Sequence, residues 1–272
     1  MMQRITPALR SCATDELRTL LTSACTAALD AGALIRSLYG RPHDIRLKGR
    51  IDLVTEADVA SERAVLAALN RDTPTIPVMA EEAAPKQKIS SGQLWVVDPL
   101  DGTTNFAHGF PHFAVSIALL EANRPQIGVV YDPMRDELFC ASRGGGTWLN
   151  GQTVTVTATR HLVEALVATG FPYEIKAALP FVMRTLSAML AEVRDIRRAG
   201  AAALDLAYVA CGRLDGFYEM NLQPWDTAAG WLLVEEAGGR ISDFAGNPFS
   251  PFIPQTLASN SILHPELLRL LR

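Results

Sequence analysis

Apolar residues recur near the N-terminus at the spacing of an α-helix. Positions 17–38 follow a period of three to four residues, and Thr14 with the two acids after it supplies a cap and first-turn charges. Gly40 and the proline that follows it end this helix. A second helix is predicted from about residue 59 to 71, whereas residues 1–13 are expected to form a loose lead-in.

Short apolar runs with the period of β-strands follow as far as about residue 157. Gly, Pro, Asn or Asp residues bound these runs, as is typical of strands. The predicted strands are Ile76–Ala80, Leu94–Val97, Phe113–Glu121, Ile127–Asp132 and Glu137–Ala141. Asn150-Gly151 is a strong signal for a tight hairpin, here between residues 146–149 and 154–156.

Strand and helix patterns alternate after about residue 160. The predicted strands are 166–169, 195–198, 216–219, 240–242 and 256–258, and the predicted helices are 177–192, 201–211, 226–236 and 264–271. Such alternation predicts a sheet covered by helices. We therefore expect two sheet-based halves, residues 1–160 and 161–272, within one integrated unit.

The composition narrows the classes of protein to consider. The chain has 272 residues, is 49% hydrophobic and carries a net charge of −4, so direct binding of nucleic acid through a basic surface is not expected. None of the 4 cysteines forms a CxxC pair. No apolar run approaches the roughly 20 residues that span a bilayer, and no signal peptide is visible. The expected protein is soluble and cytoplasmic, without a membrane partner.

An apolar strand that runs into two aspartates carries the strongest chemical signal. Asp98 ends the predicted strand 94–97, and Pro99 is expected to turn the chain so that Asp101 swings back towards Asp98. Two such carboxylates repel each other unless a cation such as Mg²⁺ bridges them. Gly102-Thr103-Thr104 can open a short helix whose free N–H groups suit a phosphate. A turn capped by Asp and Thr is the simpler alternative.

Three further stretches place acids at the ends of predicted elements. Glu81-Glu82 follow strand 76–80, Asp226 lies in the first turn of a helix, and Asp52 and Asp58 precede the helix at 59–71. Each has a simpler interpretation as a helix cap or a solvated strand end. Four acidic ends in one chain favour a shared cation site.

Taken together and in order, these motifs resemble the inositol monophosphatase family of Mg²⁺-dependent, lithium-sensitive phosphatases. The resemblance rests on Trp95–Phe106, Pro224–Gly230 with Glu236–Gly239, Asp52–Asp58 and the Glu81-Glu82 pair. It covers the chain from about residue 15 to the end. The run Arg198–Leu206 looks most like the bacterial SuhB-type branch.

The resemblance implies a mixed α/β fold, an α-β-α-β-α layered sandwich of the inositol monophosphatase/fructose-1,6-bisphosphatase type, usually as a homodimer. It implies two to three Mg²⁺ ions, with most ligands in the N-terminal half and Asp226 and the substrate-side residues in the C-terminal half. The implied first Mg²⁺ ligands are Glu81, Asp98 and the Leu100 carbonyl. The implied second-site ligands are Asp98, Asp101 and Asp226. A third ion would touch Glu81.

The resemblance also implies roles in binding and catalysis. Asp58 and Thr103 would orient and help to deprotonate the attacking water, with Glu81 beside them, and the N–H groups of Gly102 and Thr103 would hold phosphate. Asp101, Gly200, Ala202, Glu219 and Asp226 would contact the substrate. Metal-assisted phosphoryl transfer needs no protein nucleophile, and the sequence offers none.

The implied activity is hydrolysis of inositol monophosphate or a similar sugar or polyol phosphate. Alternatives within the same chemistry are fructose 1,6-bisphosphate, histidinol phosphate, NADP and nucleotide 3′-phosphates. A SuhB-like role as a protein partner of the transcription machinery in antitermination is an alternative of another class, possible around Arg197 and Arg198.

A few positions depart from the family pattern or have simpler interpretations. Ala80, Ala83 and Ala201 stand where many members carry Gly, Ser or Thr, which puts the fine shape of the pocket in doubt. The segment 46–51, with Lys48, resembles a loop near the first metal. His108 and His112 are expected to be structural, because Mg²⁺ disfavours imidazole.

Overall fold

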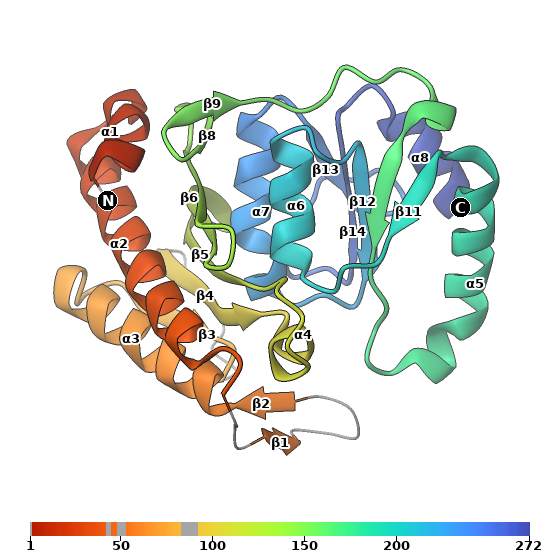
Figure 1. Ribbon diagram of the computed structural model, residues 1–272. Coiled ribbons are helices and arrows are strands. Elements are labelled where there is room, and N and C mark those ends of the chain that lie inside the picture. Colours follow the sequence, from red (N-terminus) through yellow and green to blue (C-terminus); the bar gives the residue numbers. More distant parts are fainter. Residues whose placement is uncertain (1, 42–44, 48–52, 83–91) are drawn as a thin grey trace.

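Helices and sheets alternate in five layers across the molecule (Figure 1). The computed structural model describes residues 2–41, 45–47, 53–82 and 92–272. The helices α1 to α3 form one outer layer, a seven-stranded sheet the next, and α6 with α7 the middle. A five-stranded sheet and the outer helices α5 and α8 complete the stack. The predicted α-β-α-β-α sandwich is therefore confirmed.

The first outer layer begins earlier than the sequence suggested. Residues Met2–Ser11 form helix α1, so the expectation of a loose lead-in was wrong. Ile5, Ala8 and Leu9 are buried on one face of this helix, which packs on α2 (Asp15–Leu38) and the large sheet. Pro7 lies beyond the first turn of the helix and removes one internal hydrogen bond, so the burial of this apolar face is what stabilises α1.

The second predicted helix is present as α3 (Glu56–Asp72). It begins at a capping box in which the Thr55 hydroxyl and the Asp58 carboxylate satisfy backbone N–H groups at the helix start. A two-stranded antiparallel ribbon, β1 (Ile45–Leu47) and β2 (Leu53–Thr55), precedes it. The cap fixes Asp58 in the first turn of α3, a helix that packs against β4.

The seven-stranded sheet holds its strands in sequence order from β3 to β9. Its members are β3 (Val78–Ala80), β4 (Gln93–Asp101), β5 (Ala114–Glu121), β6 (Arg124–Asp132), β7 (Glu137–Ser142), β8 (Thr147–Leu149) and β9 (Gln152–Val154). The hairpin at Asn150-Gly151 is confirmed, but its second strand begins two residues earlier than predicted because the loop holds only those two residues.

Strand β4 differs from the prediction in a way that shapes the site. The strand does not end at Asp98: it continues through Pro99 to Asp101, with an irregular register between the two aspartates. The expectation that Pro99 turns the chain out of the sheet was therefore wrong. Proline is tolerated within a strand at a bulge, where the ladder is already interrupted.

The C-terminal elements build the smaller sheet and its covering helices. Its strand order is β11 (Asp195–Arg197), β10 (Leu166–Thr169), β12 (Gly216–Met220), β14 (Gln255–Ser259) and β13 (Arg240–Ser242). A short 3₁₀ turn at Leu162–Glu164 leads into it. The helices are α5 (Ile175–Glu192), α6 (Ala202–Ala210), α7 (Pro224–Glu236) and α8 (His264–Leu271). The predicted alternation is confirmed, with bounds that shift by zero to two residues.

Helices α6 and α7 pack between the two sheets and are almost wholly apolar there. Two glycines permit the close approach: a Cβ at Gly128 of β6 would lie 2.7 Å from the carbonyl oxygen of Ala229, and one at Gly230 would lie 2.5 Å from Leu206. Such contacts are too close for any side chain. The packing fixes the N-terminal turn of α7 against the end of the large sheet.

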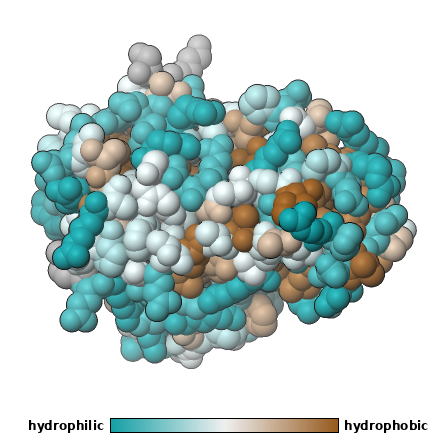
Figure 2. All heavy atoms as spheres, turned by 90° about the horizontal axis from the view of Figure 1, so that it is seen from above, coloured by the Kyte–Doolittle hydropathy of each residue, from teal (hydrophilic) through white to brown (hydrophobic). Residues whose placement is uncertain are grey.

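The face of the molecule shown in Figure 2 is mostly hydrophilic, with small groups of hydrophobic residues. Leu179, Met183 and Leu190 of α5 are among the exposed apolar side chains. Among the described residues, no helix has both the length and the apolar character needed to cross a bilayer.

Candidate active site

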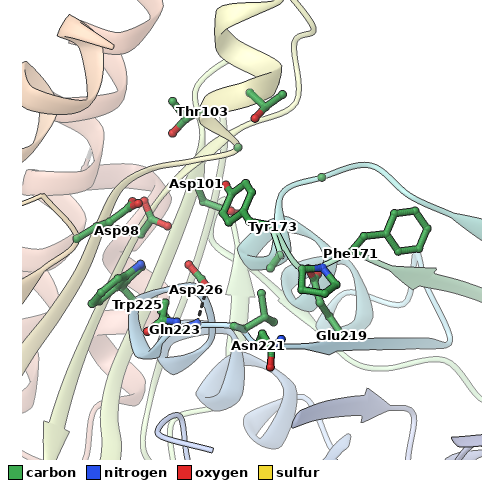
Figure 3. A pocket seen from close by; sticks show the side chains of 18 of the residues that line it. Asp98, Asp101, Thr103, Phe171, Tyr173, Glu219, Asn221, Gln223, Trp225 and Asp226 are labelled. Atoms are coloured by element: carbon green, nitrogen blue, oxygen red, sulfur yellow. Dashed lines mark hydrogen bonds between the residues drawn. The ribbon is translucent and has the colours of Figure 1, made fainter. Parts of the chain in front are cut away.

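A cavity of about 410 Å³ lies between the ends of the two sheets, with walls from both halves of the chain (Figure 3). This volume falls within the ~300–1,000 Å³ range of small-molecule pockets. The predicted site residues that line it are Glu81, Asp98, Leu100, Asp101, Gly102, Thr103, Gly200, Ala202, Glu219 and Asp226. Asp58 lies behind them, hydrogen-bonded to Thr103.

The two aspartates of β4 lie on either side of the bulge. Asp98 is 2% exposed, and one of its oxygens accepts a hydrogen bond from the N–H of Leu100 at 3.0 Å. Asp101 accepts a hydrogen bond at 2.8 Å from the N–H of Ala203, in the first turn of α6. The bulge thus lets both carboxylates reach the cavity, whereas a regular strand would separate alternate side chains.

Asp226 and Glu81 approach the same cavity from other elements. Asp226 is the third residue of α7, and its carboxylate accepts a hydrogen bond from the N–H of Gln223 at 2.7 Å in a capping box. It therefore caps its helix, as the simpler interpretation held, while it lines the cavity. Glu81 follows β3, where its N–H donates to the carbonyl of Val97 on β4.

Burial and mutual repulsion make these carboxylates hard to ionise together. Burial, followed by the charges of Glu81, Asp101 and Asp226, raises the pKa of Asp98 well above its usual range. Burial raises the pKa of Asp101 to about 7 against the opposing hydrogen bond from Ala203. The pKa of Asp226 also rises, chiefly through burial and then Asp101. The cluster favours any cation that enters it.

The donor set of the cluster fits a hard divalent cation such as Mg²⁺. Carboxylates and the Leu100 carbonyl are oxygen ligands, which suit Mg²⁺ and not softer metals. Besides burial, the charges of Asp101 and Asp226 help to raise the pKa of Asp98, and a bridging cation would relieve this repulsion. Among the described residues, no group of three His, Cys, Asp or Glu side chains is arranged closely enough to hold a metal ion. Mg²⁺ usually keeps several waters and takes only one or two carboxylates, so this is compatible with binding.

The buried Asp58 and the half-buried Thr103 form a pair beside the cluster. Thr103 lies with its hydroxyl oxygen 2.7 Å from Asp58 and 3.0 Å from the Leu100 carbonyl. The other oxygen of Asp58 accepts a hydrogen bond from the N–H of Thr55 at 2.7 Å. Ser61 donates to the Pro99 carbonyl and so ties α3 to the bulge. Burial raises the pKa of Asp58, and its hydrogen bonds with Thr55 and Thr103 oppose that rise.

The predicted short helix is present as α4 (Thr103–Ala107). Gly102 precedes it in the left-handed region, at φ 90°, and a Cβ there would lie 3.0 Å from the His112 carbonyl. No side chain caps the start of α4. The first N–H groups of this helix are thus available at the cavity wall for an anion.

The opposite wall comes from the C-terminal half. Glu219 at the end of β12 lies against Gly170, where a Cβ would approach its carboxylate to about 2 Å. Burial, followed by the charge of Asp226, raises the pKa of Glu219 to about 8, while Arg198 opposes the rise. Gly200 and Ala202 lie at the turn into α6. All three predicted substrate-side residues line the cavity.

Sequence reasoning missed several residues of this wall. Phe171, Tyr173 and Asn221 line the cavity (Figure 3), and Arg198 does as well. The available signal was position, because residues 170–173 directly follow β10 just as Glu81 directly follows β3. The sequence analysis had instead considered Arg198, together with Arg197, as a surface for a protein partner. Asp52, Lys48 and Ala83 lie outside the described residues.

Comparison with known proteins identifies the family that shares this layered fold. The family model for the inositol monophosphatase family matches residues 16–272. The chain belongs to this family.

Its relatives include proteins of two descriptions. The chain is 45% identical over 229 residues to Nus factor SuhB of Escherichia coli K12, covering 84% of this chain and 86% of that protein. It is 42% identical to inositol-1-monophosphatase of Synechocystis, covering 93% and 88%. The solved structure of the extragenic suppressor protein SuhB from Bartonella henselae matches with a TM-score of 0.88 at 41% identity, covering 93% of this chain and 98% of that chain.

Proposed function

We propose that this protein is a Mg²⁺-dependent phosphomonoesterase that hydrolyses inositol monophosphate to inositol and phosphate. The observation that carries the proposal is the gathering of Asp98, Asp101, Asp226 and Glu81 in one cavity beside the Asp58–Thr103 pair. A relative at 42% identity is described as an inositol-1-monophosphatase. The two sheet-based halves would act as one catalytic unit, since both supply walls of the cavity.

The carboxylates would hold the cations that neutralise the phosphate. Glu81, Asp98 and the Leu100 carbonyl would hold the first Mg²⁺, and Asp98, Asp101 and Asp226 the second, with a third ion near Glu81. When bound, such ions lower the pKa of the attacking water and stabilise the charge on the phosphoryl oxygens. The N–H groups of Gly102 and Thr103 would hold the phosphate at the start of α4.

The Asp58–Thr103 pair would remove the proton of the attacking water. Thr103 donates its hydroxyl hydrogen to Asp58, so its oxygen lone pairs stay available to accept a hydrogen bond from water. The proton can then pass through the hydroxyl to the buried carboxylate. At the far wall, Glu219 would bind a hydroxyl group of the polyol, and Gly200 and Ala202 would leave room for its ring.

Replacing Asp98 by Asn tests the mechanism. The variant should lose hydrolysis because one shared ligand of both ions is gone, while its circular dichroism spectrum and cooperative unfolding persist. The measurement is phosphate release from inositol 1-phosphate during a Mg²⁺ titration, with and without Li⁺. Asp195→Asn, which changes an exposed aspartate of β11, is the control. Unchanged turnover in Asp98→Asn would rule out the mechanism.

Other small phosphate esters are the alternative substrates. Fructose 1,6-bisphosphate, histidinol phosphate, NADP and nucleotide 3′-phosphates use the same phosphate chemistry. Thr104-Asn105 after the Gly102-Thr103 pair and a hydroxyl-binding Glu219 favour inositol phosphate. A panel of these esters tests the choice, and a large preference for any other ester would overturn it.

A role as a protein partner of the transcription machinery is the second candidate. It rests on the relatives described as Nus factor SuhB, which are 45% identical to this chain. Pull-down of purified transcription factors by wild type and by Asp98→Asn separates the two roles. Retention of the same factors by both proteins would support a surface role, and capture of none would exclude it.

Homodimer formation, lithium sensitivity and a cytoplasmic location stay predictions of the sequence.

A further inference from the structure

Two adjacent arginines, both exposed, make different contacts. Arg197, at the end of the edge strand β11, forms a salt bridge at 2.6 Å with Asp195 on the exposed surface. Arg198 lines the cavity. It is the one Arg or Lys among the described residues that line this cavity, whose other charged members are all acids.

Contacts on two sides hold the Arg198 guanidinium in place. Its central carbon lies 5.4 Å from the centre of the Phe171 ring, a cation–π distance. A Cβ built on Gly200 would lie 2.6 Å from Arg198 Nη1, so this nitrogen rests directly on the glycine backbone. Phe171 and Gly200 both line the cavity, which places the cation at its wall.

The donors of this guanidinium have no carboxylate partner. Arg198 forms no salt bridge with any residue in the part of the chain that the structure describes. Glu219 and Asp205 are near enough for Arg198 to oppose the rise of each pKa, yet neither comes within salt-bridge distance. A guanidinium carries five N–H donors in a planar fork that matches phosphate and carboxylate oxygens.

We propose that Arg198 binds a second anionic group, a phosphate or a carboxylate, on the alcohol part of the substrate ester. This inference rests on the proposed phosphatase function and extends its substrate class. The phosphate to be cleaved lies at the carboxylate and Thr103 end, and the alcohol part extends to the wall made by Phe171, Gly200 and Glu219. An anionic group attached to that part of the substrate would contact Arg198, the one Arg or Lys among the described residues that line the cavity.

A pair of esters that differ by one phosphate tests the assignment. The rate constant kcat/KM for phosphate release is measured with fructose 1-phosphate and with fructose 1,6-bisphosphate, for wild type and Arg198→Gln. For each protein, kcat/KM for fructose 1,6-bisphosphate is divided by kcat/KM for fructose 1-phosphate, and this ratio cancels any general loss of activity. It should fall roughly ten-fold in Arg198→Gln, the size expected for one charge-assisted contact in a partly exposed site. Arg197→Gln, which removes the neighbouring surface cation, is the matched control and should leave the ratio unchanged.

Each outcome decides the question. An unchanged ratio in Arg198→Gln overturns the proposal, and so does an equal fall in Arg197→Gln, which would indicate a diffuse field. If wild type hydrolyses neither ester, the same ratio is taken from association constants measured by calorimetry with Mg²⁺ present. A fall in that ratio supports Arg198 binding while the proposed function on these esters fails. Absence of binding, or preference for the monophosphate in wild type, overturns the proposal.

Discussion

Thr103 stands where three segments of the chain meet. Its hydroxyl lies between Asp58 of α3 and the carbonyl of Leu100 on β4, and its own backbone opens α4. Asp58 is tied in turn to the N–H of Thr55, so removing Asp58 would also remove a helix cap. The threonine is therefore the cleaner position at which to test proton removal.

Thr103→Val should lower kcat for inositol 1-phosphate by about 100-fold or more, the scale of general base catalysis. The valine keeps the shape of the side chain but can neither accept from water nor donate to Asp58. Thr103→Ser keeps the hydroxyl and should stay within about ten-fold of wild type. Steady-state kinetics at saturating Mg²⁺ measure both variants. Equal losses in Val and Ser would contradict the assigned role.

Glu219 links the cavity to the pH dependence of stability. Burial raises its pKa from 4.5 to about 8, so between these values the folded state holds a proton that the unfolded chain has lost. The contribution of this group to stability is complete below pH 4.5 and is lost as pH rises through about 8. The free energy of unfolding should fall with rising pH in this window, by at most about 1.4 kcal/mol per pH unit.

Glu219→Gln cannot ionise and should make that decline shallower. Denaturant unfolding in EDTA at several pH values between 5 and 8 measures the slope, with the exposed Glu192→Gln as the control. Asp101 contributes a slope of the same sign, because burial raises its pKa to about 7, so some decline should remain. An unaltered slope in Glu219→Gln would show that Glu219 ionises normally.

The sequence motifs were sufficient to predict which acids belong to the site, but they could not predict contacts between segments that are distant in the sequence. The acids could be recognised because each lies at the end of an apolar run or in the first turn of a helix. Arg198 carries no such signal: its position at the cavity depends on Phe171, 27 positions earlier (198 − 171), and on the fold that joins them. Sequence spacing alone cannot distinguish Arg198 from Arg197, whose side chain forms a salt bridge with Asp195 on the surface.

At the scale of elements, the packing of α7 on β6 sets the place of Asp226. A Cβ at Gly128 would lie 2.7 Å from the Ala229 carbonyl, so Gly128→Ala must push α7 away from the sheet. We expect a loss of about 1–3 kcal/mol in the free energy of unfolding, as for other overpacked cores. Because Asp226 lies on the first turn of α7, the Mg²⁺ concentration for half-maximal activity should rise as well.

Gly40→Ala is the comparison for this variant. A Cβ at Gly40 meets nothing within 4 Å, but the residue has φ +75°, so alanine there adds backbone strain of about 1–2 kcal/mol without overpacking. Denaturant unfolding and Mg²⁺ titration of both variants separate the effects. A shifted Mg²⁺ requirement in Gly40→Ala, or an unshifted one in Gly128→Ala, would refute the link between α7 packing and Asp226.

Most elements could be predicted from periodicity, and the exceptions have local causes. Strand β10 and helix α8 have the predicted bounds because apolar periodicity and turn residues agree there. Helix α1 was missed because it is short and contains Pro7, although tertiary packing of its apolar face stabilises it. The continuation of β4 through Pro99 was missed because a bulge is a property of strand pairing.

At the scale of the whole molecule, Asn105 joins the two halves at the cavity. Its amide nitrogen lies 2.7 Å from the His112 carbonyl and 2.9 Å from that of Ala199, so one side chain of the N-terminal half holds the turn that carries Arg198 and Gly200. An amide group has two N–H donors, and both are used here. The position of the far wall relative to the carboxylates therefore depends on this residue.

Asn105→Ala should lower kcat/KM for inositol 1-phosphate at least about ten-fold, although Asn105 is neither a proposed ligand nor a proposed base. Losing two hydrogen bonds frees the 199–200 turn and misplaces the substrate-side wall. Asn260→Ala is the matched control, because this buried asparagine also donates two 2.9 Å hydrogen bonds, to Thr157 and Thr159. It lies beyond the end of β14 that pairs with Gly216, away from Glu219.

Both substitutions should reduce the free energy of unfolding by about 1–3 kcal/mol, since each leaves carbonyl or hydroxyl acceptors unpaired. Of these two variants, Asn105→Ala alone should change kcat/KM, because Asn105 contacts both walls of the cavity and Asn260 contacts neither. Parallel denaturant unfolding and steady-state kinetics give both quantities for each variant. Equal kinetic losses would mean that activity follows global stability, whereas a loss confined to Asn105→Ala would mean that the contact between the halves aligns the site.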